Sequence, residues 1–161
     1  MRTLLVYFAL AAAAAGLSGA ALAEDAARAQ DRAEIEALMW RYARALDTFD
    51  PDAYAAVYTE DGEFKAGGNA TKGREALRQM IAGLAQNRDE SSPPMYHMTT
   101  DSYIEFIDES TARHHTYWLT VFGAAGQGQA PRVAAAGRGV DELVKVDGKW
   151  LIKSRNVAPQ D

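Results

Sequence analysis

The sequence has no cysteine among its 161 residues, and it has only 3 histidines and 5 prolines. Without cysteine it can form neither a disulfide framework nor a thiol nucleophile, and a zinc finger is excluded as well. The formal net charge of −5 is the opposite of the basic surface that nucleic-acid binding requires. We therefore expect no nucleic-acid partner, and any acid–base chemistry must come from His, Asp, Glu or Tyr.

Long hydrophobic runs are also absent, except at the N-terminus. Arg2 precedes an apolar run over residues 4–15, and small residues lead to the triplet 21–23 (ALA) ahead of Glu24. A basic start, an apolar run and a small-x-small site are typical of a secretory signal peptide. The alternative, an uncleaved anchor, would need about 20 apolar residues. We predict a signal peptide over residues 1–23, cleavage after Ala23, no stable membrane anchor afterwards, and a periplasmic or secreted protein.

The remaining chain has the length of one domain and shows no internal repeat. We predict a flexible lead-in over residues 24–30 and a single domain over residues 31–158. Asp31 and Glu34 form a D-x-x-E capping signal for a helix, and apolar residues follow at helical spacing up to Leu46. Further helices are predicted over 51–58 and 74–86, with a short strand at 63–65, a glycine-rich loop at 66–73 and another loop at 87–94.

The second half is rich in β-branched and aromatic residues. It predicts strands over 96–107, 111–122, 132–146 and 149–157, joined by two short hairpin turns and a longer loop at 123–131. Three helices followed by an antiparallel meander indicate an α+β fold, in which a curved sheet wraps around an amphipathic helix and leaves a pocket.

Four segments, in this order, carry a family resemblance: LMWRYARALDTFDPDAYAAVYTEDGEF, KGREALRQMI, YHMTTDSYIEFIDESTARHHTYWLTV and DELVKVDGKWLIKSR. Together they resemble the SnoaL-like branch of the nuclear transport factor 2-like superfamily, which includes scytalone dehydratase, bile acid 7α-dehydratase and ketosteroid isomerase. The resemblance implies a cone-shaped α+β barrel, with three helices against a strongly curved, mostly antiparallel sheet. It fixes no single activity, because the fold hosts dehydratases, isomerases, cyclases, hydrolases and binding proteins.

Asp47 and His97 are the first candidates for chemistry. Asp47 falls at the end of the first predicted helix, where the helix dipole disfavours a carboxylate, and His97 falls on a strand with Thr99 on the same face. Histidine titrates near neutral pH and can act as a base or acid. A solvated Asp and a structural His are the alternatives. The dehydratases of the superfamily pair an Asp and a His at matching positions, which implies that His97 moves the proton and Asp47 orients it.

Four further residues are candidates. By the same resemblance, Tyr42 is a hydrogen-bond donor to a substrate oxygen, although a buried core tyrosine is the alternative. Arg155 and His114 are predicted to bind substrate, together with Trp118. The alternative for Arg155 is a solvated residue at the strand end. Because His114 and His115 are adjacent on a strand, they must face opposite sides of the sheet, and the sequence does not decide which faces the pocket.

Other functions find less support. The acid–base residues of ketosteroid isomerase would fall near Ala66 and Gly139, which cannot do this chemistry. The histidine spacing fits no metal site, and no dinucleotide-binding or serine-hydrolase motif is present. We therefore expect neither a metal nor a cofactor.

Two functions stay open. One is a cofactor-independent lyase or isomerase, of the dehydratase or hydratase type, acting on a small apolar or cyclic molecule. The other is a non-catalytic, small-ligand-binding or interaction domain of the same fold. Alternating apolar residues such as Tyr117 and Leu119 permit a homodimer through the outer face of the sheet.

Overall fold

The computed structural model describes the backbone of residues 3–124 and 130–159, and the side chains from Glu24 onward. The chain divides into two units, residues 1–35 and residues 36–161. Helix α1 is assigned from Thr3 to Asp47, so the described part of the first unit is entirely helical. Of the described residues, none belongs to a helix long and apolar enough to cross a membrane.

The start of α1 differs from the sequence prediction. Asp31 lies inside a continuous helix and pairs with Arg28 at 3.9 Å, so the D-x-x-E pattern is not an N-cap here. The preceding segment is rich in alanine, the strongest helix former, and it continues the helix toward the N-terminus. Residues 24–30, predicted to be a flexible lead-in, are likewise helical. The predicted signal peptide coincides with the segment whose side chains lie outside the described residues, and it stays a prediction.

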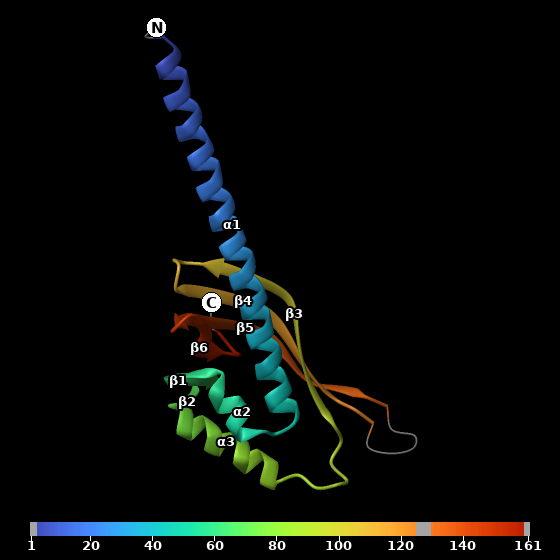
Figure 1. Cartoon of the computed structure of the whole chain (residues 1–161). Helices are drawn as coiled ribbons and strands as arrows, with labels where there is room; N and C mark the ends of the chain where they lie inside the picture. The colour runs from blue at the N-terminus through green and yellow to red at the C-terminus, as the bar shows by residue number, and fades with distance from the viewer. Residues whose placement is uncertain (1–2, 125–129, 160–161) are drawn as a thin grey trace. The chain divides into compact units, whose positions relative to one another are not determined.

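The second unit combines the end of α1 with two more helices and a sheet (Figure 1). The remaining elements, in chain order, are α2 (Pro51–Ala56), β1 (Tyr58–Ala66), β2 (Asn69–Lys72), α3 (Arg74–Gln86), β3 (Met95–Phe106), β4 (Thr111–Phe122), β5 (Arg132–Val146) and β6 (Lys149–Asn156). Asp50 caps α2, because its carboxylate accepts hydrogen bonds from the backbone amides of Asp52 and Ala53.

The six strands form one open sheet in the order β2-β1-β6-β5-β4-β3. All neighbours are antiparallel except β1 and β6, which run parallel, so the sheet is mostly antiparallel, as predicted, and its two edges stay open. The α+β class is confirmed. Part of the loop predicted at 66–73 is strand β2, because Gly67 and Gly68 adopt positive φ angles and close a two-residue hairpin. In the loop predicted at 123–131, residues 125–129 lie outside the described residues.

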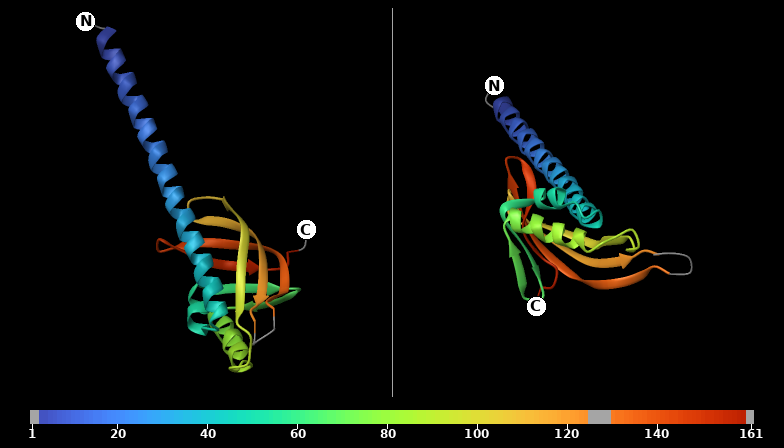
Figure 2. Two further views of the ribbon diagram at one scale, coloured as in Figure 1. Left: turned by 90° about the vertical axis from the view of Figure 1, so that its right-hand side faces the viewer. Right: turned by 90° about the horizontal axis from the view of Figure 1, so that it is seen from below.

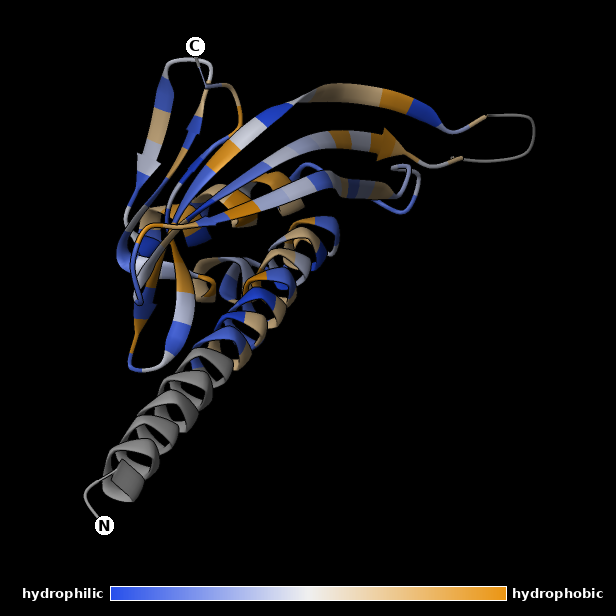
Figure 3. Cartoon of the chain, turned by 90° about the horizontal axis from the view of Figure 1, so that it is seen from above, coloured by the Kyte–Doolittle hydropathy of each residue, from blue (hydrophilic) through white to orange (hydrophobic). Residues whose placement is uncertain are grey.

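The three helical segments of the second unit lie on one side of the curved sheet (Figure 2). Hydrophobic and hydrophilic residues alternate along the long strands (Figure 3), as expected for a sheet with one buried face. The core between the layers comprises Leu38, Met39, Tyr54, Leu77, Ile81, Ile104, Leu143, Trp150 and Ile152. Toward the C-terminal end of α1, this core gives way to cavities.

Candidate functional site

Asp47, the last residue of α1, meets His97 on β3. One carboxylate oxygen of Asp47, Oδ1, lies 2.8 Å from His97 Nδ1 and also accepts a hydrogen bond from the His97 backbone amide at 2.8 Å. The two side chains are 14% and 19% exposed, so the solvated alternative for Asp47 is wrong. The helix end is unfavourable for a carboxylate, and these two hydrogen bonds offset that disadvantage.

The hydrogen bond fixes the orientation of the imidazole. An ionised carboxylate only accepts hydrogen bonds, so Nδ1 of His97 carries a proton and donates it to Asp47. In a neutral imidazole the lone pair then lies on Nε2, the nitrogen on the other side of the ring. This arrangement leaves Nε2 as the basic atom, with Asp47 holding the ring in place.

His97 borders an apolar cavity of about 180 Å³. Its wall includes three of the other predicted site residues, Tyr42, Trp118 and Arg155. The remaining wall is mainly apolar and includes Leu46, Phe64, Met98, Ala135 and Val157. Pockets for small organic molecules combine apolar walls with a few polar groups in this manner.

His97 also lines a second cavity of about 440 Å³. It shares Leu46, Phe64 and His97 with the first cavity, and α3 and α2 contribute apolar side chains to it. Arg88 also lines this cavity, and its guanidinium lies over the ring of Phe49 at 4.5 Å. His97 therefore belongs to the walls of both cavities.

Tyr42 belongs to a cluster of three buried tyrosines. Its ring lies 5.4 Å from that of Tyr54 and 6.4 Å from that of Tyr58, and the hydroxyls of Tyr54 and Tyr58 are 3.1 Å apart. Burial, followed by the proximity of Tyr42, raises the pKa of both Tyr54 and Tyr58 well above its ordinary value. The two phenols therefore stay neutral, and Tyr42 is both a core aromatic and a cavity-lining residue.

Arg155 is buried, so the solvated alternative is wrong. Its guanidinium donates to Asp141 at 2.5 Å and lies 4.2 Å from the centre of the Tyr42 ring. Burial lowers the pKa of Arg155, but the charge of Asp141 raises it, and the net direction is upward. A permanent cation thus forms part of the cavity wall, beside the Tyr42 ring.

His114 faces the inner side of the sheet and His115 the outer side. His114 is 2% exposed and is not among the residues that line the two cavities beside His97. Its Nδ1 lies 2.9 Å from Asp141, and its Nε2 lies 2.7 Å from the hydroxyl of Ser102. His115 is 40% exposed and lies 3.5 Å from Glu105. The structure places His114 in a buried network instead of on the cavity surface.

Two members of this network, Asp141 and Ser102, were not predicted from the sequence. Asp141 pairs directly with His114 on one side and with Arg155 on the other, so the three residues form a row across β4, β5 and β6. An acidic residue inside an apolar strand was the available signal, but the partners depend on strand register. Register could not be read from the sequence.

Trp118 is held in the cavity wall by two hydrogen bonds. Its indole Nε1 donates to the carbonyls of Arg138 at 3.2 Å and Val157 at 3.0 Å. Gly137 lies directly opposite on β5, and a methyl group added there would be 2.5 Å from Trp118 Cζ2. The glycine therefore provides the space that the indole occupies.

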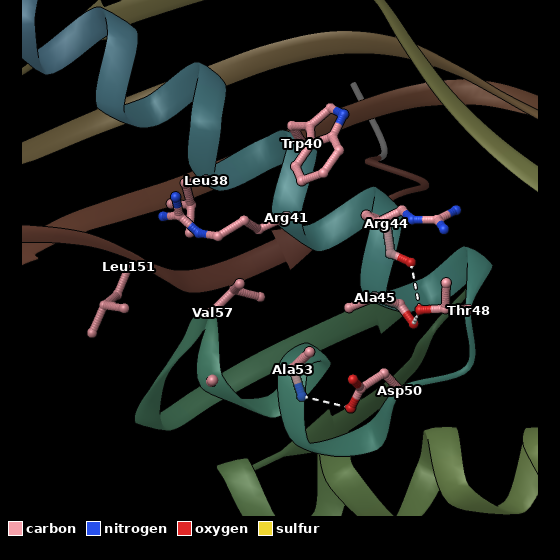
Figure 4. Close-up of a pocket in the computed structure, with 11 residues that line it drawn as sticks. Leu38, Trp40, Arg41, Arg44, Ala45, Thr48, Asp50, Ala53, Val57 and Leu151 are labelled. Carbon is pink, nitrogen blue, oxygen red and sulfur yellow. Dashed lines mark hydrogen bonds between the residues drawn. The ribbon is translucent and has the colours of Figure 1, made fainter.

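A separate groove of about 380 Å³ lies between the end of α1, α2 and β6 (Figure 4). Leu38, Val57 and Leu151 line it together with Arg41 and Arg44. None of the predicted site residues lies in this groove. Within the described residues no cluster of three or more His, Asp or Glu side chains could hold a metal ion.

The comparisons with known proteins agree with this architecture. The SnoaL-like domain family matches residues 27–156, which is most of the chain. The protein belongs to the SnoaL-like domain family. No curated protein matches it.

Solved structures give the same fold. A variant of a Mycobacterium tuberculosis protein of unknown function is 27% identical with a TM-score of 0.71, covering 83% of this chain and 73% of its own. A proposed scytalone dehydratase from Novosphingobium aromaticivorans is 25% identical with a TM-score of 0.69, covering 82% and 85%. A Catenulispora acidiphila structure in complex with S-DNPA is 26% identical with a TM-score of 0.66, covering 79% and 91%. This SnoaL-like protein thus shares its fold with these three proteins.

Proposed function

We propose that this SnoaL-like protein is a cofactor-independent lyase or isomerase that transfers protons on a small apolar or cyclic molecule. His97 is the general base and acid, Asp47 orients it, and Tyr42 donates a hydrogen bond to a carbonyl or leaving oxygen. The observation that carries the proposal is the 2.8 Å contact between Asp47 and His97 at the border of two cavities.

The chemistry follows from the protonation of the pair. Nε2 of His97 accepts a proton from a substrate carbon, and Asp47 stabilises the imidazolium that forms. The same nitrogen then returns the proton, either to the leaving hydroxyl in a dehydration or to a neighbouring carbon in an isomerisation. Neither reaction needs an electron acceptor or a metal in this scheme.

Tyr42 and Arg155 complete the scheme on the other wall. Negative charge that develops on a substrate oxygen is stabilised by preorganised donors and by nearby positive charge. Arg155 lies over the Tyr42 ring and supplies that charge from a buried position. Trp118 and Phe64 supply flat apolar surface for the ring of a substrate.

A second function is supported by one observation. The Catenulispora acidiphila neighbour is in complex with S-DNPA, so a protein with this fold binds another molecule. Binding without turnover is therefore the competing proposal, with Asp47 and His97 serving as a polar contact in the pocket.

The experiment screens hydroxysteroids, hydroxylated aromatics and polyketide-like acids by thermal shift, and then assays turnover of each ligand found. His97→Ala should keep ligand binding and lose turnover, whereas His115→Ala on the outer face should keep both. Ligands that bind but are never converted, from about pH 5 to pH 9 where histidines titrate, would replace the enzyme proposal with the binding proposal.

Two further proposals concern the export of the protein and its assembly. We propose export with cleavage after Ala23, which N-terminal sequencing of the secreted or periplasmic protein tests.

We also propose a homodimer through the outer face of the sheet, where Tyr96, Tyr103 and Tyr117 are exposed. Sedimentation of the wild type and of Tyr117→Glu tests the dimer, because a buried charge would separate the subunits.

A further inference from the structure

A β-bulge in β3 brings Ser102 to the inner face of the sheet. Thr100 pairs with Tyr117 and Tyr103 pairs with His115, so Asp101 and Ser102 together oppose a single residue of β4. Asp101 has a φ of 48°, in the left-handed region that Asp tolerates better than most residues. The extra residue changes which face each side chain takes, and bulges commonly re-aim side chains in this manner.

The re-aimed hydroxyl of Ser102 contacts His114. Ser102 Oγ lies 2.7 Å from His114 Nε2, and His114 Nδ1 lies 2.9 Å from Asp141 Oδ2. A hydroxyl nucleophile, a base within hydrogen-bond reach and a third group that orients the base define a nucleophilic triad by geometry. The three residues come from three neighbouring strands, and no short sequence motif links them.

The protonation state fits that role. Asp141 as a carboxylate only accepts hydrogen bonds, so His114 Nδ1 donates to it and Nε2 accepts the hydrogen bond from Ser102. Arg155 compensates the charge of Asp141, which is fully buried. The base is thus held in the tautomer that can remove the hydroxyl proton.

Burial differs along the triad. The side chains of Asp141 and His114 are 0% and 3% exposed, whereas Ser102 is exposed to solvent. A buried base and orienting group are rigid and shielded from water, and an exposed nucleophile can meet a substrate. Ser102 and His114 are not among the residues that line the cavities beside His97, so the nucleophile and its base lie outside the site proposed above.

The geometry points to a second catalytic site in this protein: Ser102 is a nucleophile activated by His114 and Asp141, and its substrates are small activated carboxylic esters. Ser102 Oγ bonds to the ester carbonyl carbon, and the hydroxyl proton passes to His114 Nε2. The C–O bond to the alcohol breaks, and the alcohol leaves with that proton. Water then attacks the acyl-serine, giving one proton to His114, which returns it to Ser102 Oγ as the acid is released.

Two measurements on the purified full chain test the site. A fluorophosphonate probe should modify the wild type once, at Ser102, as located by intact mass and peptide mass spectrometry. p-Nitrophenyl acetate should give a burst of nitrophenol that approaches one equivalent. Ser102→Ala should lower the labelling rate and the burst by about 100-fold or more, the contribution expected of an activated nucleophile.

Ser110 provides the matched control. It is exposed, and its hydroxyl donates to the carboxylate of Asp108 at 3.0 Å instead of to a histidine. Ser110→Ala should label as the wild type does, and a Ser102→Cys thiol should react with iodoacetamide faster than a Ser110→Cys thiol. Absence of labelling in the wild type, a label at another residue, or equal reactivity of the two thiols would overturn the proposal.

Discussion

Asp47 Oδ1 receives two hydrogen bonds from a single residue, one from the imidazole Nδ1 of His97 and one from its backbone amide, each at 2.8 Å. The carboxylate thereby fixes both the ring and the strand that presents it. A substitution of Asp47 should therefore lower turnover more than it weakens ligand binding.

Asp47→Asn tests this relationship. An amide at this position can donate as well as accept, so the tautomer of His97 is no longer enforced. Turnover of any substrate found in the screen should fall by about 100-fold, with little change in KM. Asp52→Asn is the control, because Asp52 is highly exposed and its ion pair with Arg78 spans 3.7 Å. Equal turnover in Asp47→Asn and the wild type would remove Asp47 from the mechanism.

Arg155→Met tests the buried ion pair. It leaves Asp141 without its cation inside the protein, and breaking a buried pair in this way costs about 3–5 kcal/mol of unfolding free energy. Urea unfolding measures the loss. Lys153→Met should change stability far less, since Lys153 is partly exposed and its partner Asp61 is exposed. The double variant Arg155→Met, Asp141→Leu should recover part of the loss, and a double variant as unstable as the single one would contradict this account.

Gly137→Ala tests the position of Trp118. The added methyl group would lie 2.5 Å from the indole, so the ring must move out of the cavity wall and give up two hydrogen bonds. We expect a loss of about 1–3 kcal/mol, a shift in tryptophan fluorescence and weaker ligand binding. Gly83→Ala, in the interior of α3 with open space around it, should instead leave stability unchanged or raise it. Unchanged fluorescence in Gly137→Ala would place the indole elsewhere.

Asp108 gives a pH dependence. Hydrogen bonds, first from the Thr111 side chain and then from the backbone and side chain of Ser110, lower the pKa of Asp108 to about 2. A carboxyl group with a depressed folded-state pKa contributes stability above its unfolded pKa, and the contribution is lost as pH falls toward 2. Asp108→Ala should thus have a lower urea midpoint than the wild type at about pH 7, and the difference should disappear near pH 2. A difference that persists at the lowest pH would show that ionisation of Asp108 is not responsible.

The sequence predicted the local elements well because their signals are local. The strands over 111–122 and 132–146 match their predicted bounds, and Asp50 caps α2 next to Pro51 as its position suggested. The contact between Asp47 and His97 was also predicted, but from resemblance to a family and not from spacing. The catalytic roles of these two residues remain predictions.

The contacts that could not be predicted from the sequence depend on pairing between segments that are distant in the chain. The row from His114 through Asp141 to Arg155 exists because of the register of β4, β5 and β6. The contact of Ser102 with His114 additionally requires one extra residue in β3. Likewise, the parallel pairing of β1 with β6 joins strands that are far apart in the chain, so a hairpin-based prediction did not reveal it.

The place of β6 between β1 and β5 has a consequence for how the protein is made. The first strand has its main partner in the last one, so the ribosome must deliver residues 149–156 before the two halves of the sheet can join. Folding that waits for such distant contacts is slow, and the incomplete chain leaves strand edges unpaired. Arg155 also arrives with β6, so Asp141 gains its counter-charge only in the final stage of assembly.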